Sequence, residues 1–217
     1  KGVKRVVALS TDKASSPINL YGASKLASDK MFVAGNAYSG EHSSIFSVVR
    51  YGNVMGSRGS VIPFFYNRKD LKTLPITDTR MTRFMISLEQ GVSLVWKAFD
   101  DMHGGEIYVK KIPSIKITDL AKIIAPSASH EVIGIRPGEK LHEQMISMED
   151  AVSTYEYDDY FKILPVINDW SADKNRIKDG KKVPEDFVYS SETNTAWVTK
   201  DDMNHWLDQN IDSLGAI

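Results

Sequence analysis

The sequence predicts an α/β protein that combines a parallel sheet with a smaller α+β lobe. Val6–Leu9 is a continuous apolar run, which is typical of a strand buried on both faces in a parallel sheet. A helical segment from about Leu20 to Tyr38 follows, and then a second strand over Ser44–Arg50. Strand, helix and strand at this spacing form a βαβ unit, for which a right-handed crossover is expected.

Capping and turn residues indicate where these and later elements begin and end. Asn19 is expected to cap the first helix and Gly40 to end it. Ser87–Gln90 resembles a capping box. The elements expected further along are a helix from there to about Met102, a strand over Glu106–Val109, a helix near Thr118–Ala125, a strand near Glu131–Ile135, a helix after Pro137–Gly138 and a helix from Thr199 to about Asp208. The stretch Asp169–Glu192 is polar and is expected to be irregular.

The composition excludes several kinds of partner and site. Apolar residues make up 42% of the 217 residues, charged residues 25%, and the formal net charge is -1, so no overall basic field favours nucleic acid or a membrane surface. No segment approaches the roughly 20 apolar residues that span a bilayer. The absence of cysteine fits a reducing cytoplasm and rules out thiolate metal sites, and the five histidines show no metal-ligand spacing. We therefore expect a cytoplasmic protein without a metal site.

Tyr21 and Lys25 carry the strongest chemical signal. Residues four apart lie on one helix face, and an ammonium beside a phenol favours the phenolate. A Tyr-x-x-x-Lys spacing is common by chance, but Ser10 and Thr11 end the preceding strand, and ligands of open α/β sheets bind at the carboxyl ends of strands. A hydroxyl there, followed by tyrosine and lysine on the next helix, makes the catalytic set typical of short-chain dehydrogenases.

The resemblance is closer than this superfamily. In order along nearly the whole chain, six segments together resemble the inverting UDP-N-acetylglucosamine 4,6-dehydratases, which begin pseudaminic acid synthesis for flagellin glycosylation: Ser10–Ala14, Pro17–Lys25, Val49–Val54, Gly56–Ser60, Thr79–Phe84 and Gly134–Lys140. Related retaining 4,6-dehydratases and C5-epimerases typically carry Met at the position of Tyr21, so tyrosine here favours the inverting branch.

The resemblance implies roles for five catalytic residues. Tyr21, aided by Lys25 and Thr11, would deprotonate the substrate hydroxyl on carbon 4. Asp12 would supply the acid for loss of water from carbon 6, and Lys13 would handle the carbon-5 proton. The sequence leaves open which of Asp12 and Lys13 does which task, and the alternative for both is a solvated turn pair without a catalytic role.

The resemblance also implies binding residues and two regions. Residues 1–112 would be the C-terminal half of an NAD(P)-binding Rossmann domain, and residues 113–217 a nucleotide-sugar binding lobe and C-terminal tail. The implied cofactor is NADP, with NAD as the alternative, and the implied partner is UDP-N-acetylglucosamine. The residues expected at the cofactor are Ser10, Tyr21, Lys25, Val54, Met55, Gly56, Ser57 and Arg58, and those expected at the substrate are Asn53, Arg83, Arg136 and Glu139. Glu139 could instead pair with Arg136, which would make that segment structural.

One departure from the family pattern concerns the cofactor. No glycine-rich turn for a pyrophosphate occurs in this sequence, which begins at Lys1. We therefore expect a fragment of a longer protein, with exposed apolar strand surface, that would be inactive alone. The full protein is expected to form homo-oligomers. Two alternatives stay open: a nucleotide-sugar 4-epimerase of the same superfamily, and a non-catalytic module that binds sugar nucleotides.

Overall fold

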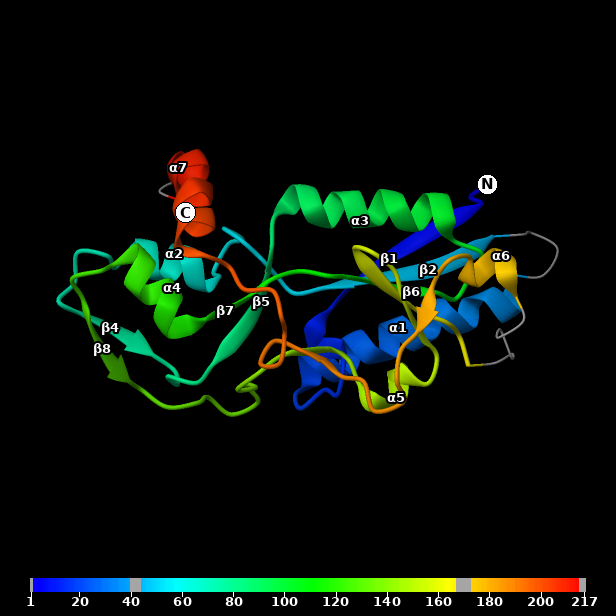
Figure 1. Ribbon diagram of the computed structural model, residues 1–217, viewed down its shortest axis with the longest axis horizontal. Coiled ribbons are helices and arrows are strands. Elements are labelled where there is room, and N and C mark those ends of the chain that lie inside the picture. Colours follow the sequence, from blue (N-terminus) through cyan, green and yellow to red (C-terminus); the bar gives the residue numbers. More distant parts are fainter. Residues whose placement is uncertain (1, 40–43, 167–172, 215–217) are drawn as a thin grey trace. The chain divides into compact units, whose positions relative to one another are not determined.

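A computed structural model describes residues 2–39, 44–166 and 173–214 (Figure 1). These residues fall into two compact units, each built from separate stretches of the chain. Unit 1 comprises 1–51, 89–111 and 144–189, and unit 2 comprises 52–88, 112–143 and 190–217. The predicted division at residue 112 differs from this pattern, because the chain passes between the units several times.

Unit 1 is built on a mixed sheet with the strand order β1-β2-β6-β11-β10-β12. Its parallel part consists of β1 (Arg5–Thr11), β2 (Ile45–Tyr51) and β6 (Ile107–Lys110). The antiparallel part consists of β11 (Tyr160–Ile163), β10 (Thr154–Glu156) and β12 (Lys181–Lys182). The parallel α/β arrangement is confirmed, and residues that the sequence assigned to the second lobe extend the same sheet.

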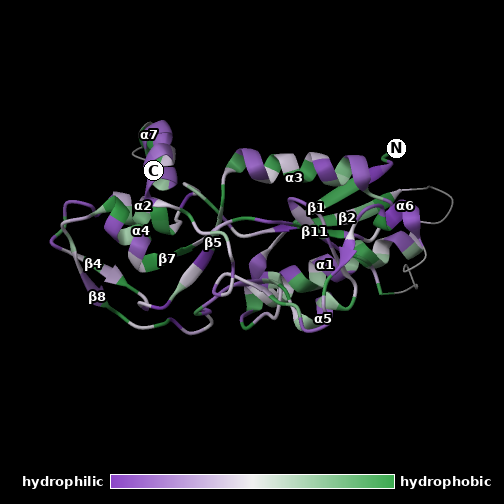
Figure 2. Ribbon diagram, viewed as in Figure 1, coloured by the Kyte–Doolittle hydropathy of each residue, from purple (hydrophilic) through white to green (hydrophobic). Residues whose placement is uncertain are grey.

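Two long helices flank the strands of unit 1. α1 (Leu20–Tyr38) lies on one side of the strands and α3 (Leu88–Asp101), all but the first residue of which belongs to unit 1, on the other (Figure 1). The predicted cap of α1 is confirmed, since Asn19 Oδ1 accepts a hydrogen bond from the Gly22 amide at 2.7 Å. Hydrophobic and hydrophilic residues are mixed along α3 (Figure 2), and its buried Leu94 packs in one cluster with Val49. Each helix therefore buries one face on the sheet.

The first strand is less buried than its apolar run predicted. β1 is the edge of the sheet in the described part of the chain, and Leu9 is 53% exposed. The expectation of burial on both faces is wrong, because Ser10 is the one residue of β1 that is buried and Leu9 faces solvent. The expectation of exposed apolar strand surface is confirmed at the same residue.

Short elements complete unit 1. A 3-10 turn, η1 (Asp12–Ala14), joins β1 to α1 and lies against β9 (Gln144–Ile146). The others are α5 (Met148–Ala151), α6 (Lys174–Ile177) and β13 (Tyr189–Ser190), where the chain passes to unit 2. The predicted irregular stretch thus contains short helical and strand segments, and its residues 169–172 lie outside the described residues, as does the predicted helix stop at Gly40.

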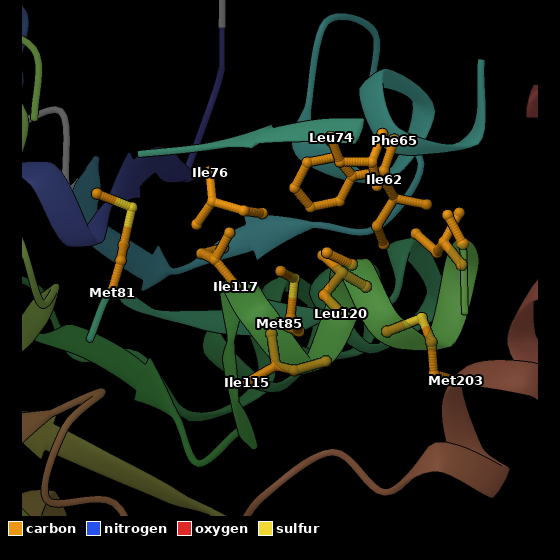
Figure 3. Packing of buried hydrophobic residues seen from close by; sticks show 13 residues of the cluster. Ile62, Phe65, Leu74, Ile76, Met81, Met85, Ile115, Ile117, Leu120 and Met203 are labelled. Atoms are coloured by element: carbon orange, nitrogen blue, oxygen red, sulfur yellow. The ribbon is translucent and has the colours of Figure 1, made fainter. Parts of the chain in front are cut away.

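Unit 2 packs helices and short strands around one apolar core. β3 (Asn53–Val54), β5 (Thr82–Ile86) and β7 (Ser114–Lys116) form one sheet, and β4 (Thr73–Ile76) pairs with β8 (Ser129–Val132). The helices are α2 (Val61–Tyr66), α4 (Ile117–Ile124) and α7 (Lys200–Leu214). Figure 3 shows side chains from these strands and helices converging, among them Leu74, Met85, Leu120 and Met203.

The predicted strand and helix around residues 131–145 are placed differently. The strand is β8, which ends at Val132. The described residues directly after Pro137–Gly138, up to Gln144, form no helix; Gly138 has φ 78° and the chain makes a turn there. The backbone carbonyls of Lys140 and Leu141 accept hydrogen bonds from Arg83, so they are not available for a helix. The last helix is confirmed and is longer than predicted, with Thr199 Oγ1 capping the Asp202 amide.

A search of the described residues for a helix long and apolar enough to cross a membrane gave none.

Candidate functional site

The predicted catalytic residues Thr11, Asp12 and Lys13 form one tight turn at the carboxyl end of β1. Thr11 is the N-cap of η1, and its hydroxyl accepts from the Lys13 amide at 3.4 Å. The extended backbone of Thr11 ends the strand and the 3-10 turn begins at once. This turn brings the side chains of three predicted site residues to the edge of the sheet where ligands of α/β proteins bind.

Asp12 is the buried centre of this turn. Its Oδ1 accepts from the hydroxyl of Thr11 at 2.8 Å and from the Lys13 ammonium at 3.0 Å. Its side chain is 0% exposed, whereas the Lys13 side chain is 32% exposed. The second oxygen, Oδ2, is buried and has no hydrogen-bond partner among the described residues. A buried carboxyl oxygen without a partner costs free energy unless another group binds it, so Asp12 is not a solvated turn residue.

Tyr21 and Lys25 lie on the first two turns of α1. The Lys25 ammonium donates to the backbone carbonyl of Leu9 at 3.1 Å, which ties it to the end of β1. Tyr21 is 53% exposed, so its phenol is accessible from solvent. Ser10, the residue between Leu9 and Thr11, is buried, and its hydroxyl has no partner in the part of the chain described.

Gly22 explains how α1 can begin so close to the turn. A Cβ at this position would lie 2.4 Å from the backbone oxygen of Lys13 and 2.9 Å from Cβ of Pro17. Only a residue without a side chain lets the first turn of the helix pack directly on η1. The close packing of α1 on η1 therefore requires glycine at position 22. The sequence motif includes this glycine, but the steric reason for it is seen only in the structure.

Tyr51 is a second phenol at this edge of the sheet that the sequence did not single out. In the parallel register Tyr51 pairs with Thr11, so the two side chains point to the same face. Burial, and next the negative charge that Tyr21 carries when ionised, raise the pKa of Tyr51. Tyr51 therefore keeps its proton and can donate a hydrogen bond near Tyr21. Tyr51 lies within the Val49–Val54 motif, but only the strand register shows that it lies beside Thr11.

The predicted cofactor loop belongs to unit 2 and starts with β3. The amide of Met55 donates to the Ile86 carbonyl at 2.9 Å, which continues the pairing of β3 with β5. Gly56 and Gly59 have φ 71° and 74°, values that favour glycine. Asn53 Oδ1 is buried and lacks a hydrogen-bond partner within the described ranges. The loop residues Ser57 and Arg58 are exposed.

The predicted substrate residues of unit 2 differ in burial and in the contacts that their side chains make. Arg83 is 7% exposed and donates to the carbonyls of Thr82, Leu141 and Lys140. It also pairs with Glu139 at 3.4 Å. The ion-pair partner of Glu139 is therefore Arg83 and not Arg136, the alternative that the sequence suggested. Arg136 is exposed, and its side chain makes no ion pair or hydrogen bond with the described residues. Arg83 thus braces the segment 139–143, whereas the guanidinium of Arg136 is available.

The structure therefore brings the predicted residues into two sets. In unit 1, hydrogen bonds join Thr11, Asp12 and Lys13, and α1 brings Lys25 to the same end of β1. In unit 2, the loop from Asn53 to Arg58 follows β3, and Arg83 holds Glu139.

Comparisons with known proteins agree with the motifs. Residues 1–165 match the family model described as polysaccharide biosynthesis protein. The chain is 56% identical over 210 residues to UDP-N-acetylglucosamine 4,6-dehydratase (inverting) of Campylobacter jejuni, covering 93% of this chain and 63% of that protein. It is 41% identical over 186 residues to UDP-glucose 4-epimerase of Rickettsia canadensis, covering 83% of this chain and 54% of that protein.

A solved structure has the same fold. The X-ray structure of Pen from Bacillus thuringiensis superposes with a TM-score of 0.84 at 31% identity, over 97% of this chain and 64% of that one. The chain spans less than two thirds of the length of these relatives. The resemblance inferred from the motifs is confirmed, and the chain belongs to the polysaccharide biosynthesis protein family.

Proposed function

We propose that this chain carries the catalytic residues of an enzyme that converts UDP-N-acetylglucosamine to a UDP-4-keto-6-deoxy-L-sugar, with inversion at carbon 5. The proposal includes the rest of what the resemblance implies: a cytoplasmic homo-oligomer that catalyses the first step of pseudaminic acid synthesis for flagellin or other surface glycosylation. One observation carries the reaction class. The carboxyl group of Asp12 is completely buried between Thr11 and Lys13, and its Oδ2 has no partner among the described residues.

An elimination of water needs this kind of group. The leaving hydroxyl on carbon 6 must receive a proton, and the proton on carbon 5 must be removed. Asp12 and Lys13 stand together as an acid and a base candidate, with nitrogen and oxygen 3.0 Å apart. A 4-epimerase transfers hydride at carbon 4 and expels no water, so it has no use for such a pair.

The residues of unit 1 account for the proton transfers. Tyr21 takes the proton from the carbon-4 hydroxyl, and the ammonium of Lys25 stabilises the phenolate. In the resulting 4-ketone the proton on carbon 5 is acidic. A proton shift from the Lys13 ammonium to the Asp12 carboxylate leaves an amine, which removes the carbon-5 proton, and a carboxylic acid, which protonates the departing hydroxyl. A proton from solvent, added to carbon 5 from the opposite face, then gives the L-sugar. The division of tasks between Asp12 and Lys13 is part of the proposal.

A nicotinamide cofactor fits this set of residues in part. When bound, it would supply an acceptor for hydride from carbon 4 and a hydride donor for carbon 6. The buried hydroxyl of Ser10, without a partner in the described structure, and the side chains of Tyr21 and Lys25, one helical turn apart, suit its ribose and nicotinamide. The loop Val54–Arg58 is the other segment proposed to hold it. This sequence has no glycine-rich turn for the pyrophosphate, and the proposal of NADP over NAD rests on the resemblance alone.

The substrate residues are proposed in unit 2. Arg136 is exposed and suited to a diphosphate, because a guanidinium binds phosphate oxygens bidentately. Asn53, with a buried amide oxygen that lacks a partner in the described ranges, is suited to a sugar hydroxyl. Arg83 and Glu139 are engaged with each other, and we propose that they shape the substrate-binding segment.

The proposal is tested with the complete protein, incubated with UDP-N-acetylglucosamine and NADP in deuterated water. The expected product is a 4-keto-6-deoxy sugar with the L configuration that carries deuterium at carbon 5. A product with the D configuration would contradict inversion. A sugar that keeps its carbon-6 hydroxyl and differs only at carbon 4 would establish the epimerase, and binding without turnover would establish the non-catalytic module.

A further inference from the structure

Arg50 is a buried cation at the end of β2, on the side of the sheet that faces α1. Its residue is 1% exposed. Side chains two or four apart on a strand share a face, and Phe46, four residues earlier, packs against Phe32 of α1. In the register of the parallel pair Arg50 lies beside Ser10, the residue before the catalytic turn. The guanidinium therefore lies between the sheet and the helix that carries Tyr21.

The guanidinium joins α1 to the sheet through one carboxylate. Nη2 of Arg50 pairs with Oδ2 of Asp29 at 3.1 Å, and Asp29 is 1% exposed. Nη1 donates to the Met145 carbonyl at 2.7 Å and pairs with Asp150 at 3.1 Å. Asp150 belongs to α5, which carries none of the proposed catalytic residues, and its side chain is 20% exposed.

The place of Asp29 on the helix gives the ion pair its significance. Tyr21, Lys25 and Asp29 follow at intervals of four residues, so they lie on successive turns of one side of α1. Lys25 is fixed at the end of β1 by the Leu9 carbonyl, and Asp29 is fixed one turn further by Arg50. The buried pair thus sets both the rotation of the helix and its height on the sheet.

We propose that Arg50 is a positioning residue, which through Asp29 holds α1 in the orientation that Tyr21 and Lys25 need for proton removal. This inference rests on the proposed function. The Arg50–Asp29 pair touches no reacting atom in this account, and acts only through the helix.

Two physical effects support this role: the reaction rate is sensitive to small displacements of a catalytic group, and a buried ion pair is sensitive to the loss of one partner. A displacement of about 1 Å in a catalytic group costs up to roughly 100-fold in rate. Removal of Asp29 leaves the buried Arg50 with the partly exposed Asp150 as its remaining carboxylate partner, and the loss of a partner from a buried ion pair is strongly destabilising. At Arg50 the element most directly released is α1.

The test compares Asp29→Asn with Asp150→Asn in the complete protein. Each substitution removes one of the two carboxylates that pair with Arg50, and each keeps the shape of the side chain. Amide hydrogen exchange along α1, kcat and KM for UDP-N-acetylglucosamine are measured on the folded fraction of both. With Asp29→Asn we expect about tenfold faster exchange in α1 and a roughly 10- to 100-fold lower kcat at unchanged KM. With Asp150→Asn the exchange rate in α1 and kcat should stay close to wild type.

Other results overturn the inference. If both variants behave alike, the charge balance at Arg50 matters and the helix contact does not. If Asp29→Asn reduces only the yield of folded protein and kcat is unchanged, the pair is purely structural. A wild-type protein that fails to dehydrate any UDP-sugar would defeat the proposed function instead, and amide exchange alone would then decide whether Asp29 holds α1.

Discussion

Asp12 and Lys13 form an ion pair of 3.0 Å in which the Asp12 side chain is completely buried and the Lys13 side chain is about one-third exposed. The turn directs the carboxylate inward and leaves the Lys13 side chain partly open to solvent. An acid and a base with different exposure, side by side, are suited to two proton transfers on adjacent carbon atoms of a substrate.

Asp12→Asn is expected to stop the loss of water while the fold is retained. The amide oxygen can still accept from Thr11, but the amide cannot supply the acidic proton. We expect kcat to fall roughly 10²- to 10⁴-fold. Product formation by the variant is compared with that of Asp158→Asn, which removes an exposed carboxylate of the same unit. Equal activity of the two variants would exclude Asp12 from the chemistry.

Tyr21→Phe is expected to abolish turnover at the first step, because no phenol remains to take the carbon-4 proton. The fall in kcat should again be about 10²- to 10⁴-fold. Tyr38→Phe is the matched control, since Tyr38 lies at the other end of α1 and is 87% exposed. Binding of UDP-N-acetylglucosamine, measured by calorimetry, should be similar in both variants. Normal turnover by Tyr21→Phe would transfer the role of base to another residue.

Gly22→Ala is expected to separate α1 from the catalytic turn. The added Cβ would lie 2.4 Å from the Lys13 carbonyl oxygen, so the backbone of one element must shift. Such overpacking costs about 1–3 kcal/mol of unfolding free energy, and kcat should fall as well.

Gly35→Ala is the control for this prediction, on the same helix. Its added Cβ would meet Phe46 at an ordinary 3.5 Å. Alanine is a better helix former than glycine by about 1 kcal/mol, so this variant should be as stable as wild type or more stable. Urea unfolding of the two variants, together with their kcat values, decides the point; a Gly22→Ala protein as active as Gly35→Ala would show that the close approach is dispensable.

The local elements around the catalytic turn could be predicted because their signals are local. Asn19 caps α1 as its side chain predicts, and Thr199 caps α7. The predicted bounds of β1 are correct within two residues and those of β2 within one. Each of these signals depends on neighbours in sequence, so no tertiary information was needed.

Features that depend on distant contacts could not be predicted in this way. Arg83 was predicted to lie at the substrate, but the sequence did not show that it also donates to the backbone carbonyls of Lys140 and Leu141, almost 60 residues away in sequence. The helix expected after Gly138 is replaced by a turn for the same reason. The role of Arg50 depends on Asp29 and on strand register. No periodicity or motif spacing contains these pairings.

A separate buried network offers a prediction on stability and pH. Asp101, at the end of α3, pairs with Lys162 of β11 and with Lys178, and accepts from the Tyr108 hydroxyl at 2.9 Å. Burial raises the pKa of the Asp101 carboxyl, but the hydrogen bonds from Lys162 and Lys178 outweigh it and lower this pKa to about 2. The network therefore favours the ionised carboxylate in the folded protein.

The sign of the pH effect follows from this lowered pKa. Since the folded pKa of about 2 lies below the ordinary 3.8, Asp101 stabilises the fold fully at pH values above 3.8. That stabilisation is lost progressively as the pH falls from about 4 toward 2.

Asp101→Asn, which leaves Lys162 buried without its carboxylate, should lower the unfolding free energy by about 3 kcal/mol near neutral pH. Urea unfolding at several pH values should show the gap between wild type and Asp101→Asn closing in acid. Asp100→Asn, a neighbouring exposed carboxylate, should unfold like wild type throughout. A gap that is independent of pH would mean that the Asp101 charge contributes nothing, and that the variant loses stability through packing alone.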